Sequence, residues 1–324
     1  MNPRWANLRV CVTGGAGFLG RAVCRRLEAL QPRALIIPRR KEYDLTHTGD
    51  AERLIRDTRP DLVVHLAAEV GGIGANRERP GRFFYANMMM GVNLIESARR
   101  HGVGKFVQIG TVCAYPKHCP PPFREEDLWS GFPEETNAPY GVAKRALLTM
   151  LQAYRAEYGF KGVYLLPVNL YGPGDNFDPR TSHVIPALIR RFSEASARGA
   201  SEVVCWGTGT ASREFLYVDD AAEGIVRACE VYDDGEPINL GTGREVTVAE
   251  LAAMIARILG YSGSIRWDGT MPDGQPRRQL DVSRAKARLD WRARTPLERG
   301  LERTVAWWRA NEQRIAAAGA ARGG

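Results

Sequence analysis

The chain has 324 residues, of which 44% are hydrophobic and 25% charged, a composition typical of a folded protein that buries its core without disulfides. No apolar run approaches the roughly 20 residues of a membrane-spanning helix, and the first residues lead straight into an expected strand rather than a signal peptide. The net charge of +8 is spread along the chain without basic blocks. We therefore expect a cytoplasmic protein with no membrane or nucleic-acid partner, whose positive field suits small anionic ligands.

The six cysteines are scattered and form no CxxC pair. In a reducing compartment they are expected to be free thiols. His118 and Cys119 are adjacent, but no further candidate ligands lie near them in the sequence. We therefore expect no metal site.

The first half of the chain alternates short apolar runs with segments of helical periodicity. Strands are expected at 8–13, 34–38, 61–68, 105–111 and 161–173, and helices at 18–30, 51–60, 83–102 and 138–159. Gly102 and Gly159 close the last two helices. This alternation predicts an α/β fold with a doubly wound parallel sheet of the Rossmann type.

The pattern loosens after Gly172, where Pro and Arg become more frequent and only short strands are expected. We expect a dinucleotide-binding domain and a smaller C-terminal α/β substrate domain, packed on the carboxyl end of the sheet. The expected ranges are 1–172 with a return segment at about 214–243 for the first domain, 173–213 and 244–312 for the second, and 313–324 for a flexible tail.

The segment VTGGAGFLG places Gly14, Gly17 and Gly20 as GxxGxxG between the first strand and the first helix. Such a turn lets the backbone approach a pyrophosphate, which then lies at the helix N-terminus. The alternative is that the glycines serve only a tight turn. The position of the glycine motif after an N-terminal strand, in a repeating βα pattern, favours a dinucleotide site.

Arg39 and Arg40 stand at the end of the second strand in LIIPRRKEYDL. An acidic residue there is typical of NAD binding, whereas a guanidinium binds the 2′-phosphate of NADP through paired donors. The sequence therefore favours NADP(H) as cofactor, the alternative being that both arginines are solvated surface residues.

Tyr140 and Lys144 are spaced i, i+4 in NAPYGVAK and so share one face of the expected helix. A neighbouring ammonium lowers the pKa of a phenol from its ordinary value of about 10. Thr111 ends the fourth expected strand. Together with the glycine motif, this set resembles the extended short-chain dehydrogenase/reductases, which implies that Thr111, Tyr140 and Lys144 are catalytic.

A narrower resemblance covers residues 8 to 310. The blocks AAEVGGIGANRERPGRFFYANMMM, GTVCAYPK, PVNLYGPGDNFDPRTSHVIPALIRRF, WGTGTASREFLYVDD and PDGQPRRQLDV are similar to those of GDP-L-fucose synthases. The resemblance implies a GDP-4-keto-6-deoxy-hexose substrate, epimerised at C3 and C5 and then reduced at C4 with NADPH. It implies that Cys113 is the epimerisation base and His183 the acid. Without the resemblance, Cys113 is more readily interpreted as a small buried residue and His183 as a structural histidine.

The resemblance also implies the remaining contacts. Cofactor contacts are expected from Gly14, Gly17, Phe18, Leu19, Arg39, Arg40, Asp44, Leu45, Leu66, Ala67, Ala68, Lys144 and Asn169. Substrate contacts are expected from Asn169, Arg191, Trp206, Arg213 and Arg278. Asn87 is expected to brace the active-site loop or to make a plain helix contact. A homodimer is expected through the helices that carry Asn87 and Tyr140.

The chain departs from that family at Ala16, where relatives often have Arg, and at Thr111, where Ser is more usual. Thr keeps the hydroxyl but stiffens χ1. Three alternatives stay open: an epimerase or reductase on a related nucleotide sugar, such as a GDP-colitose or GDP-heptose precursor; a catalytically silent dinucleotide-binding protein; and a nucleic-acid-binding protein.

Overall fold

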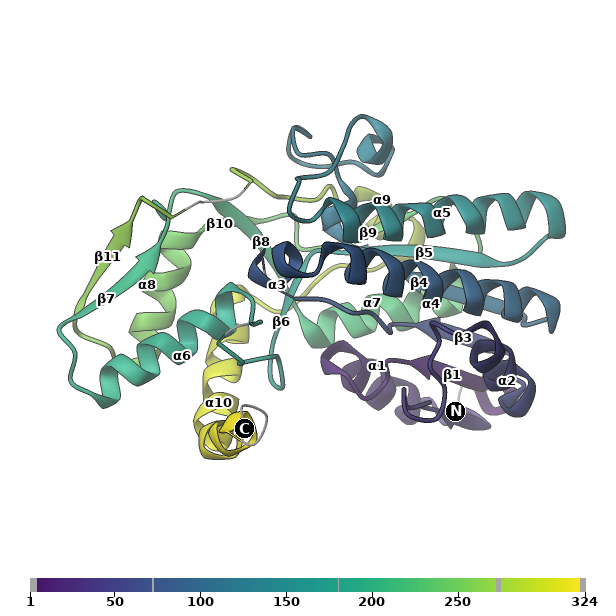
Figure 1. Cartoon of the computed structure of the whole chain (residues 1–324), viewed down its shortest axis with the longest axis horizontal. Helices are drawn as coiled ribbons and strands as arrows, with labels where there is room; N and C mark the ends of the chain where they lie inside the picture. Colours follow the sequence, from purple (N-terminus) through teal and green to yellow (C-terminus); the bar gives the residue numbers. More distant parts are fainter. Residues whose placement is uncertain (1–4, 72, 180, 272–274, 321–324) are drawn as a thin grey trace.

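The computed structural model describes residues 5–71, 73–179, 181–271 and 275–320, and its larger part is built on a sheet of six parallel strands (Figure 1). The strands lie in the order β2-β1-β3-β4-β5-β9. Their bounds are β1 (Arg9–Thr13), β2 (Ala34–Ile36), β3 (Leu62–His65), β4 (Lys105–Ile109), β5 (Gly162–Pro167) and β9 (Ile238–Leu240). Every neighbouring pair is parallel, which confirms the predicted doubly wound α/β sheet.

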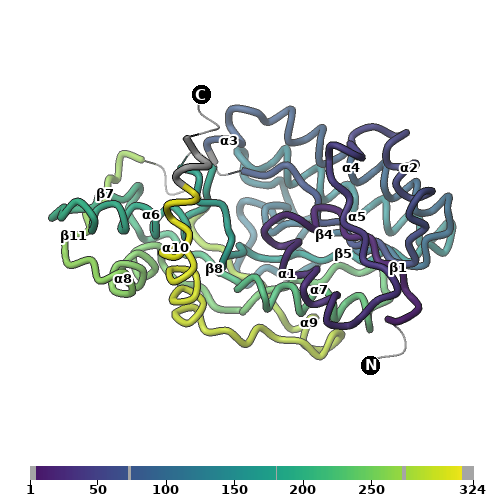
Figure 2. The backbone as a smooth tube through the Cα atoms, turned by 90° about the horizontal axis from the view of Figure 1, so that it is seen from below, coloured from purple at the N-terminus to yellow at the C-terminus, as the bar shows by residue number. Residues whose placement is uncertain are grey.

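Helices cover the two faces of this sheet (Figures 1 and 2). On one face α1 (Phe18–Ala29) packs against α7 (Val218–Val231), and α7 against α9 (Ser283–Leu289). On the other face α4 (Pro80–Arg100) lies between α2 (Thr48–Thr58) and α5 (Ala138–Tyr158). The short helices α3 (Ile73–Glu78), η1 (Trp5–Asn7), η2 (Val112–Ala114) and η3 (Glu125–Trp129) complete this part.

Local sequence explains where the two long helices α4 and α5 begin and end. Each has a proline in its first turn, where the missing N–H leaves no helical hydrogen bond unmade. Helix α5 ends at Gly159, which has a φ of 65° and closes the helix in the left-handed region. The two helices approach closely at Gly91, because a Cβ there would lie 2.2 Å from Leu147 Cδ1.

The smaller part has its own buried core and lies beside the carboxyl ends of the large sheet (Figure 1). A three-stranded sheet has the order β10-β8-β6, and β7 pairs with β11. The bounds are β6 (Asn169–Tyr171), β7 (Glu202–Trp206), β8 (Ser212–Tyr217), β10 (Glu245–Thr247), β11 (Ser264–Asp268), α6 (Val184–Ala197), α8 (Val248–Leu259) and α10 (Leu297–Ala320). Within the described residues, no helix is both long and apolar enough to cross a membrane.

The single strand expected over 161–173 is wrong, because the chain changes sheets within it. Strand β5 ends at Pro167 beside β9, and β6 begins at Asn169 beside β8. Proline has no N–H to continue a ladder, so a strand tends to end there.

Two observations bear on the expected domain ranges, which stay predictions. Leu280, Leu289 and Trp291 belong to the larger core, although 244–312 was expected in the substrate domain. Helix α10 continues to Ala320, into the segment expected as a flexible tail from residue 313. Residues 321–324 lie outside the described part of the chain.

Candidate active site

A cavity of about 1180 Å³ lies at the carboxyl ends of the parallel strands, between the two cores. It exceeds the usual range for a drug-sized ligand, about 300–1,000 Å³, and so suits a dinucleotide together with a second ligand. Every residue to which the sequence assigns catalysis, cofactor contact or substrate contact lines this cavity. Residues far apart in the chain, such as Gly14, Cys113, His183 and Arg278, therefore share one site.

The glycine turn between β1 and α1 forms one wall of the cavity. Gly14 has a φ of 71°, and a Cβ there would lie 2.7 Å from the Ala67 backbone nitrogen. Gly17 caps α1 without any side-chain hydrogen bond to the first turn. The first amides of the helix are thus left for another acceptor, and a diphosphate is the group that fits such a turn.

We expect Gly20→Ala to weaken dinucleotide binding at least tenfold and to destabilise the fold by about 1–3 kcal/mol, the usual range for overpacking. The added Cβ would lie 2.1 Å from Gly14 O and so displace the turn. Gly49→Ala is the matched control, because Gly49 is in helix α2 with nothing within 4 Å of the new Cβ. Thermal unfolding and titration with NADPH measure both effects, and equal behaviour of the two variants would contradict this reading of the turn.

A charged cluster lies at the end of β2. Arg39 and Arg40 line the cavity, and Arg40 Nη1 donates to Glu69 Oε1 over 2.9 Å. Glu69 follows β3 and is a cavity residue that the sequence did not single out. Its backbone is held by Asn87, whose side chain bonds both the N–H and the carbonyl of Glu69. Asn87 therefore braces the segment after β3.

Tyr140 and Lys144 project from α5 toward the end of β4, as their spacing predicts. Lys144 Nζ lies 5.9 Å from the centre of the Tyr140 ring and donates to Ile109 O over 3.1 Å. Burial raises the pKa of Tyr140, with a further contribution from Cys113, while a hydrogen bond from Thr111 opposes the rise. The phenol is therefore protonated at neutral pH, and its pKa is raised rather than lowered as expected from the neighbouring Lys144.

Lys144 is only 2% exposed, and this burial lowers its pKa to about 8. Below pH 8 the folded protein thus holds a poorly solvated ammonium, at a cost of about 3 kcal/mol relative to an ordinary lysine. Between pH 8 and about 10.5 the unfolded chain keeps its proton while the folded chain loses it, so the cost shrinks.

We expect Lys144→Met to stabilise the cofactor-free protein by about 1–3 kcal/mol at pH 6.5, because it removes a desolvated charge. If Lys144 contacts the cofactor, as the sequence predicts, the same change should weaken cofactor binding. The stability gain should shrink by about 2 kcal/mol at pH 9.5. Urea unfolding at the two pH values measures this. A stability difference independent of pH would mean that the lysine is not desolvated.

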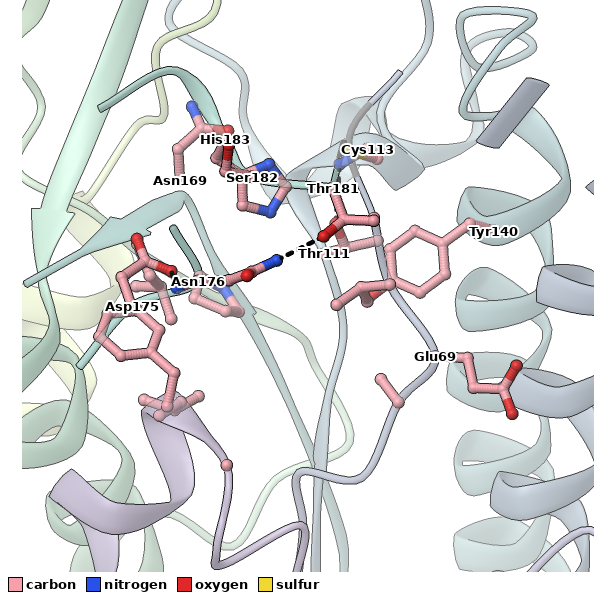
Figure 3. A pocket seen from close by; sticks show the side chains of 18 of the residues that line it. Glu69, Thr111, Cys113, Tyr140, Asn169, Asp175, Asn176, Thr181, Ser182 and His183 are labelled. Atoms are coloured by element: carbon pink, nitrogen blue, oxygen red, sulfur yellow. Dashed lines mark hydrogen bonds between the residues drawn. The ribbon is translucent and has the colours of Figure 1, made fainter. Parts of the chain in front are cut away.

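Thr111 and Cys113 lie on the turn that follows β4 (Figure 3). Thr111 Oγ1 accepts the Cys113 N–H over 3.1 Å, so its own proton is free to donate elsewhere. Arg278 Nη1 lies 3.7 Å from Cys113 Sγ. Arg278 thus brings a guanidinium from a distant part of the chain against the Cys113 sulfur, a contact that the sequence did not single out.

His183 comes from the opposite side of the cavity, at the residue immediately before α6 (Figure 3). Its ring is open to the cavity yet surrounded by protein atoms, and this desolvation lowers its pKa. The imidazole is therefore mainly neutral at pH 7. An anionic ligand beside it favours the protonated form.

The substrate candidates line the part of the cavity formed by the smaller core. Arg191 lies 6.0 Å from the centre of the Trp206 ring, which is 65% exposed. Asn169 Nδ2 donates to Glu214 O, and Arg213 lies beside it on β8. Gln275, which the sequence did not single out, accepts from Arg278 through Oε1 and so orients the guanidinium beside Cys113.

Fold and site together define a dinucleotide-binding oxidoreductase whose cavity has room for a second ligand beside Tyr140. A family model described as "NAD dependent epimerase/dehydratase family" matches residues 10–241. The chain belongs to the NAD dependent epimerase/dehydratase family.

Curated relatives are similar over most of the chain. The chain is 43% identical to a probable GDP-L-fucose synthase 1 of rice, covering 93% of this chain and 92% of the relative. It is 41% identical to the GDP-L-fucose synthase of Escherichia coli, covering 95% and 98%. It is 32% identical to a GDP-L-colitose synthase of Yersinia pseudotuberculosis, covering 93% and 98%.

Solved structures agree in fold. A GDP-L-fucose synthetase from Naegleria fowleri bound to NADP superposes with a TM-score of 0.85 at 28% identity, covering 94% of each chain. A GDP-6-OMe-4-keto-L-xylo-heptose reductase from Campylobacter jejuni superposes with a TM-score of 0.88 at 27% identity, covering 94% of this chain and 99% of the other.

Proposed function

We propose that the protein is an NADPH-dependent epimerase-reductase that converts GDP-4-keto-6-deoxy-D-mannose to GDP-L-fucose. The observation that carries this proposal is the shared cavity, which joins Thr111, Tyr140 and Lys144 to Cys113 and His183. A reductase alone needs only the first three groups. The relatives named GDP-L-fucose synthases support the choice of substrate.

The cavity fits NADP(H) by the uncapped glycine turn and the arginines after β2. The diphosphate would be held by Gly14, Gly17, Phe18 and Leu19, and the 2′-phosphate by Arg39 and Arg40. The adenosine would contact Asp44, Leu45, Leu66, Ala67 and Ala68. The nicotinamide end would contact Lys144 and Asn169. When bound, NADPH supplies the hydride that reduces the C4 ketone.

Epimerisation uses the two faces of the sugar. The C4 ketone acidifies the C–H bonds at C3 and C5, and the Cys113 thiolate removes one of these protons to leave an enolate. His183 returns a proton from the opposite side of the cavity, which inverts the carbon. Substrate diphosphate and enolate charge favour the imidazolium that this step requires.

Thr111 and Tyr140 serve both reactions through one oxygen. Both hydroxyls donate to the oxygen at C4, which stabilises the enolate during epimerisation. Tyr140 then gives its proton to the same oxygen during reduction. Its raised pKa keeps it protonated until this oxygen becomes strongly basic. Arg191, Trp206, Arg213 and Arg278 hold the nucleotide and sugar, with the arginines facing the diphosphate or the sugar.

A reductase or an epimerase on a related nucleotide sugar is the second candidate. The colitose synthase among the relatives and the heptose reductase among the structures favour it. These possibilities differ from the first proposal either in the step that the protein catalyses or in the sugar that it accepts.

The decisive experiment incubates the protein with GDP-4-keto-6-deoxymannose and NADPH in deuterated water. The proposal requires NADPH oxidation together with deuterium at C3 and C5 of the product. Oxidation without deuterium identifies a pure reductase, and deuterium without oxidation identifies a pure epimerase. If neither signal appears, colitose-type and heptose-type substrates are tested next.

A homodimer through α4 and α5 is part of the proposal. These helices lie side by side on one face of the molecule, and α4 exposes Phe84 and Tyr85 (37% and 54%). Burying such side chains between two copies stabilises a dimer. Light scattering after size-exclusion chromatography should give twice the chain mass, and Tyr85→Glu should shift it toward the monomer.

We assign the reaction to the cytoplasm. All six cysteines are free thiols, as expected for a chain in a reducing compartment. Cell fractionation with an antibody against the chain tests this assignment.

A further inference from the structure

Glu69 sits between two arginines at the cofactor end of the cavity. Arg82 donates to it through two nitrogens, Nε to Oε2 over 2.8 Å and Nη2 to Oε1 over 2.6 Å. Arg40 donates from Nη1 to the same Oε1 over 2.9 Å. One carboxylate therefore serves two guanidinium groups, and only one of them, Arg40, lines the cavity.

The carboxylate is fixed in place rather than loosely paired. The Glu69 side chain is 22% exposed, and the backbone of the same residue is bonded twice to the fully buried Asn87. The paired donors of Arg82 match the geometry of a carboxylate and add directional strength. Arg82 is also the leading cause of the lowered pKa of Glu69, so the charge on Glu69 persists well below neutral pH.

Arg40 is the more exposed of the two arginines in this cluster. Its side chain is 61% exposed, and besides Glu69 it meets a second carboxylate, Asp44, at 3.5 Å from Nε. An arginine whose N–H groups are bonded to carboxylates must break these hydrogen bonds before it can bind a phosphate through paired donors. A carboxylate left close to that phosphate then repels it.

We propose that Glu69 is a specificity-determining residue that competes with the cofactor 2′-phosphate for Arg40, and that Arg82 makes the exchange possible by keeping the charge of Glu69 neutralised. This inference rests on the proposed use of NADP(H). Glu69 lowers the preference for NADPH over NADH, because only NADPH has the phosphate that must displace it. Arg82 raises that preference by binding Glu69 after Arg40 has turned to the phosphate.

The test measures dissociation constants in the absence of the sugar substrate. Nicotinamide fluorescence reports the binding of NADPH and NADH, and calorimetry reports the binding of 2′,5′-ADP and 5′-ADP. Glu69→Gln keeps the size of the side chain but removes its charge. We expect NADPH and 2′,5′-ADP to bind about threefold to tenfold more tightly, with NADH and 5′-ADP changed less than twofold, and the gain to shrink at high ionic strength. Glu298→Gln is the matched control, because it also removes one charge from an arginine pair, with Arg257, outside the cavity.

Arg82→Gln tests the second half of the proposal. It should weaken NADPH binding threefold to tenfold in the native background but less than twofold in the Glu69→Gln background, because its effect acts through Glu69. Equal weakening in both backgrounds would mean that Arg82 binds the phosphate itself. Weaker or unchanged NADPH binding by Glu69→Gln overturns the proposal, since Glu69 would then orient Arg40 or be neutral.

These readouts are independent of turnover. A chain that fails to process GDP-4-keto-6-deoxymannose but shows the expected ratios refutes only the proposed function. A chain that processes this sugar with unchanged ratios refutes only the role of Glu69.

Discussion

Cys113→Ser is expected to lower deuterium incorporation at C3 and C5 of the sugar by about 10²–10⁴-fold, the usual contribution of a general base. A serine hydroxyl holds its proton far more tightly than a thiol, so it is a poor base at neutral pH. The side chains are similar in size, and the bond from the Cys113 N–H to Thr111 is made by the backbone. Affinity for NADPH should therefore stay within twofold. Mass spectrometry of the product and fluorescence titration measure the two quantities.

Cys119→Ser is the control for this variant, because Cys119 lies a few residues further along the same loop but outside the cavity. It should keep its exchange rate within about twofold. His183→Gln should behave differently from both, since Cys113 can still remove and return a proton on its own face. Exchange then continues while inversion is lost. If Cys113→Ser exchanges at the native rate, another group is the base.

Tyr140→Phe is expected to lower the rate of ketone reduction by about 10²–10⁴-fold. The change removes the only proton donor on α5 that reaches the C4 oxygen in the proposed mechanism, while keeping the ring beside Lys144. Deuterium exchange should also fall, but by less, because Thr111 still donates to the enolate oxygen. Single-turnover measurement of NADPH oxidation separates this chemical step from binding.

Tyr164→Phe controls for loss of a buried tyrosine hydroxyl in the same region. Its hydroxyl donates to the backbone carbonyl of Lys144 and does not line the cavity. We expect about 1 kcal/mol of lost stability, the net contribution of one hydrogen bond, with turnover within about threefold. Similar losses of turnover in both tyrosine variants would assign the effect to packing around α5 rather than to proton donation.

Elements set by local chemistry were predictable. The helix expected over 138–159 corresponds to α5, because a proline in its first turn and a left-handed glycine after it are local signals. The parallel sheet followed from the alternation of strands and helices. The strand expected over 161–173 was wrong. Pro167 is a local sign that a strand ends, but nothing local shows that the chain then joins a second sheet.

The residues predicted for the site line one cavity, but their electrostatics could not be predicted from the sequence. Motif spacing pointed to Tyr140 and Lys144, and a family resemblance to Cys113 and His183. The pKa values could not be predicted from motifs, because desolvation depends on every chain segment that covers a group. The pKa of Lys144 falls to about 8, and the pKa of Tyr140 rises instead of falling.

What the sequence determined by itself is the glycine turn, the helix that carries Tyr140 and Lys144, and the hydroxyl and thiol after β4, because each is a contact between residues close in the chain. Only the tertiary structure decided that Arg278 meets the Cys113 sulfur and that Glu69 links Arg40 to Arg82. These are contacts of charged side chains between separate segments. The sequence around a charged residue has no periodicity or turn signal from which its partner could be predicted. Packing of the two cores brings such residues together, and that packing is a property of the whole chain.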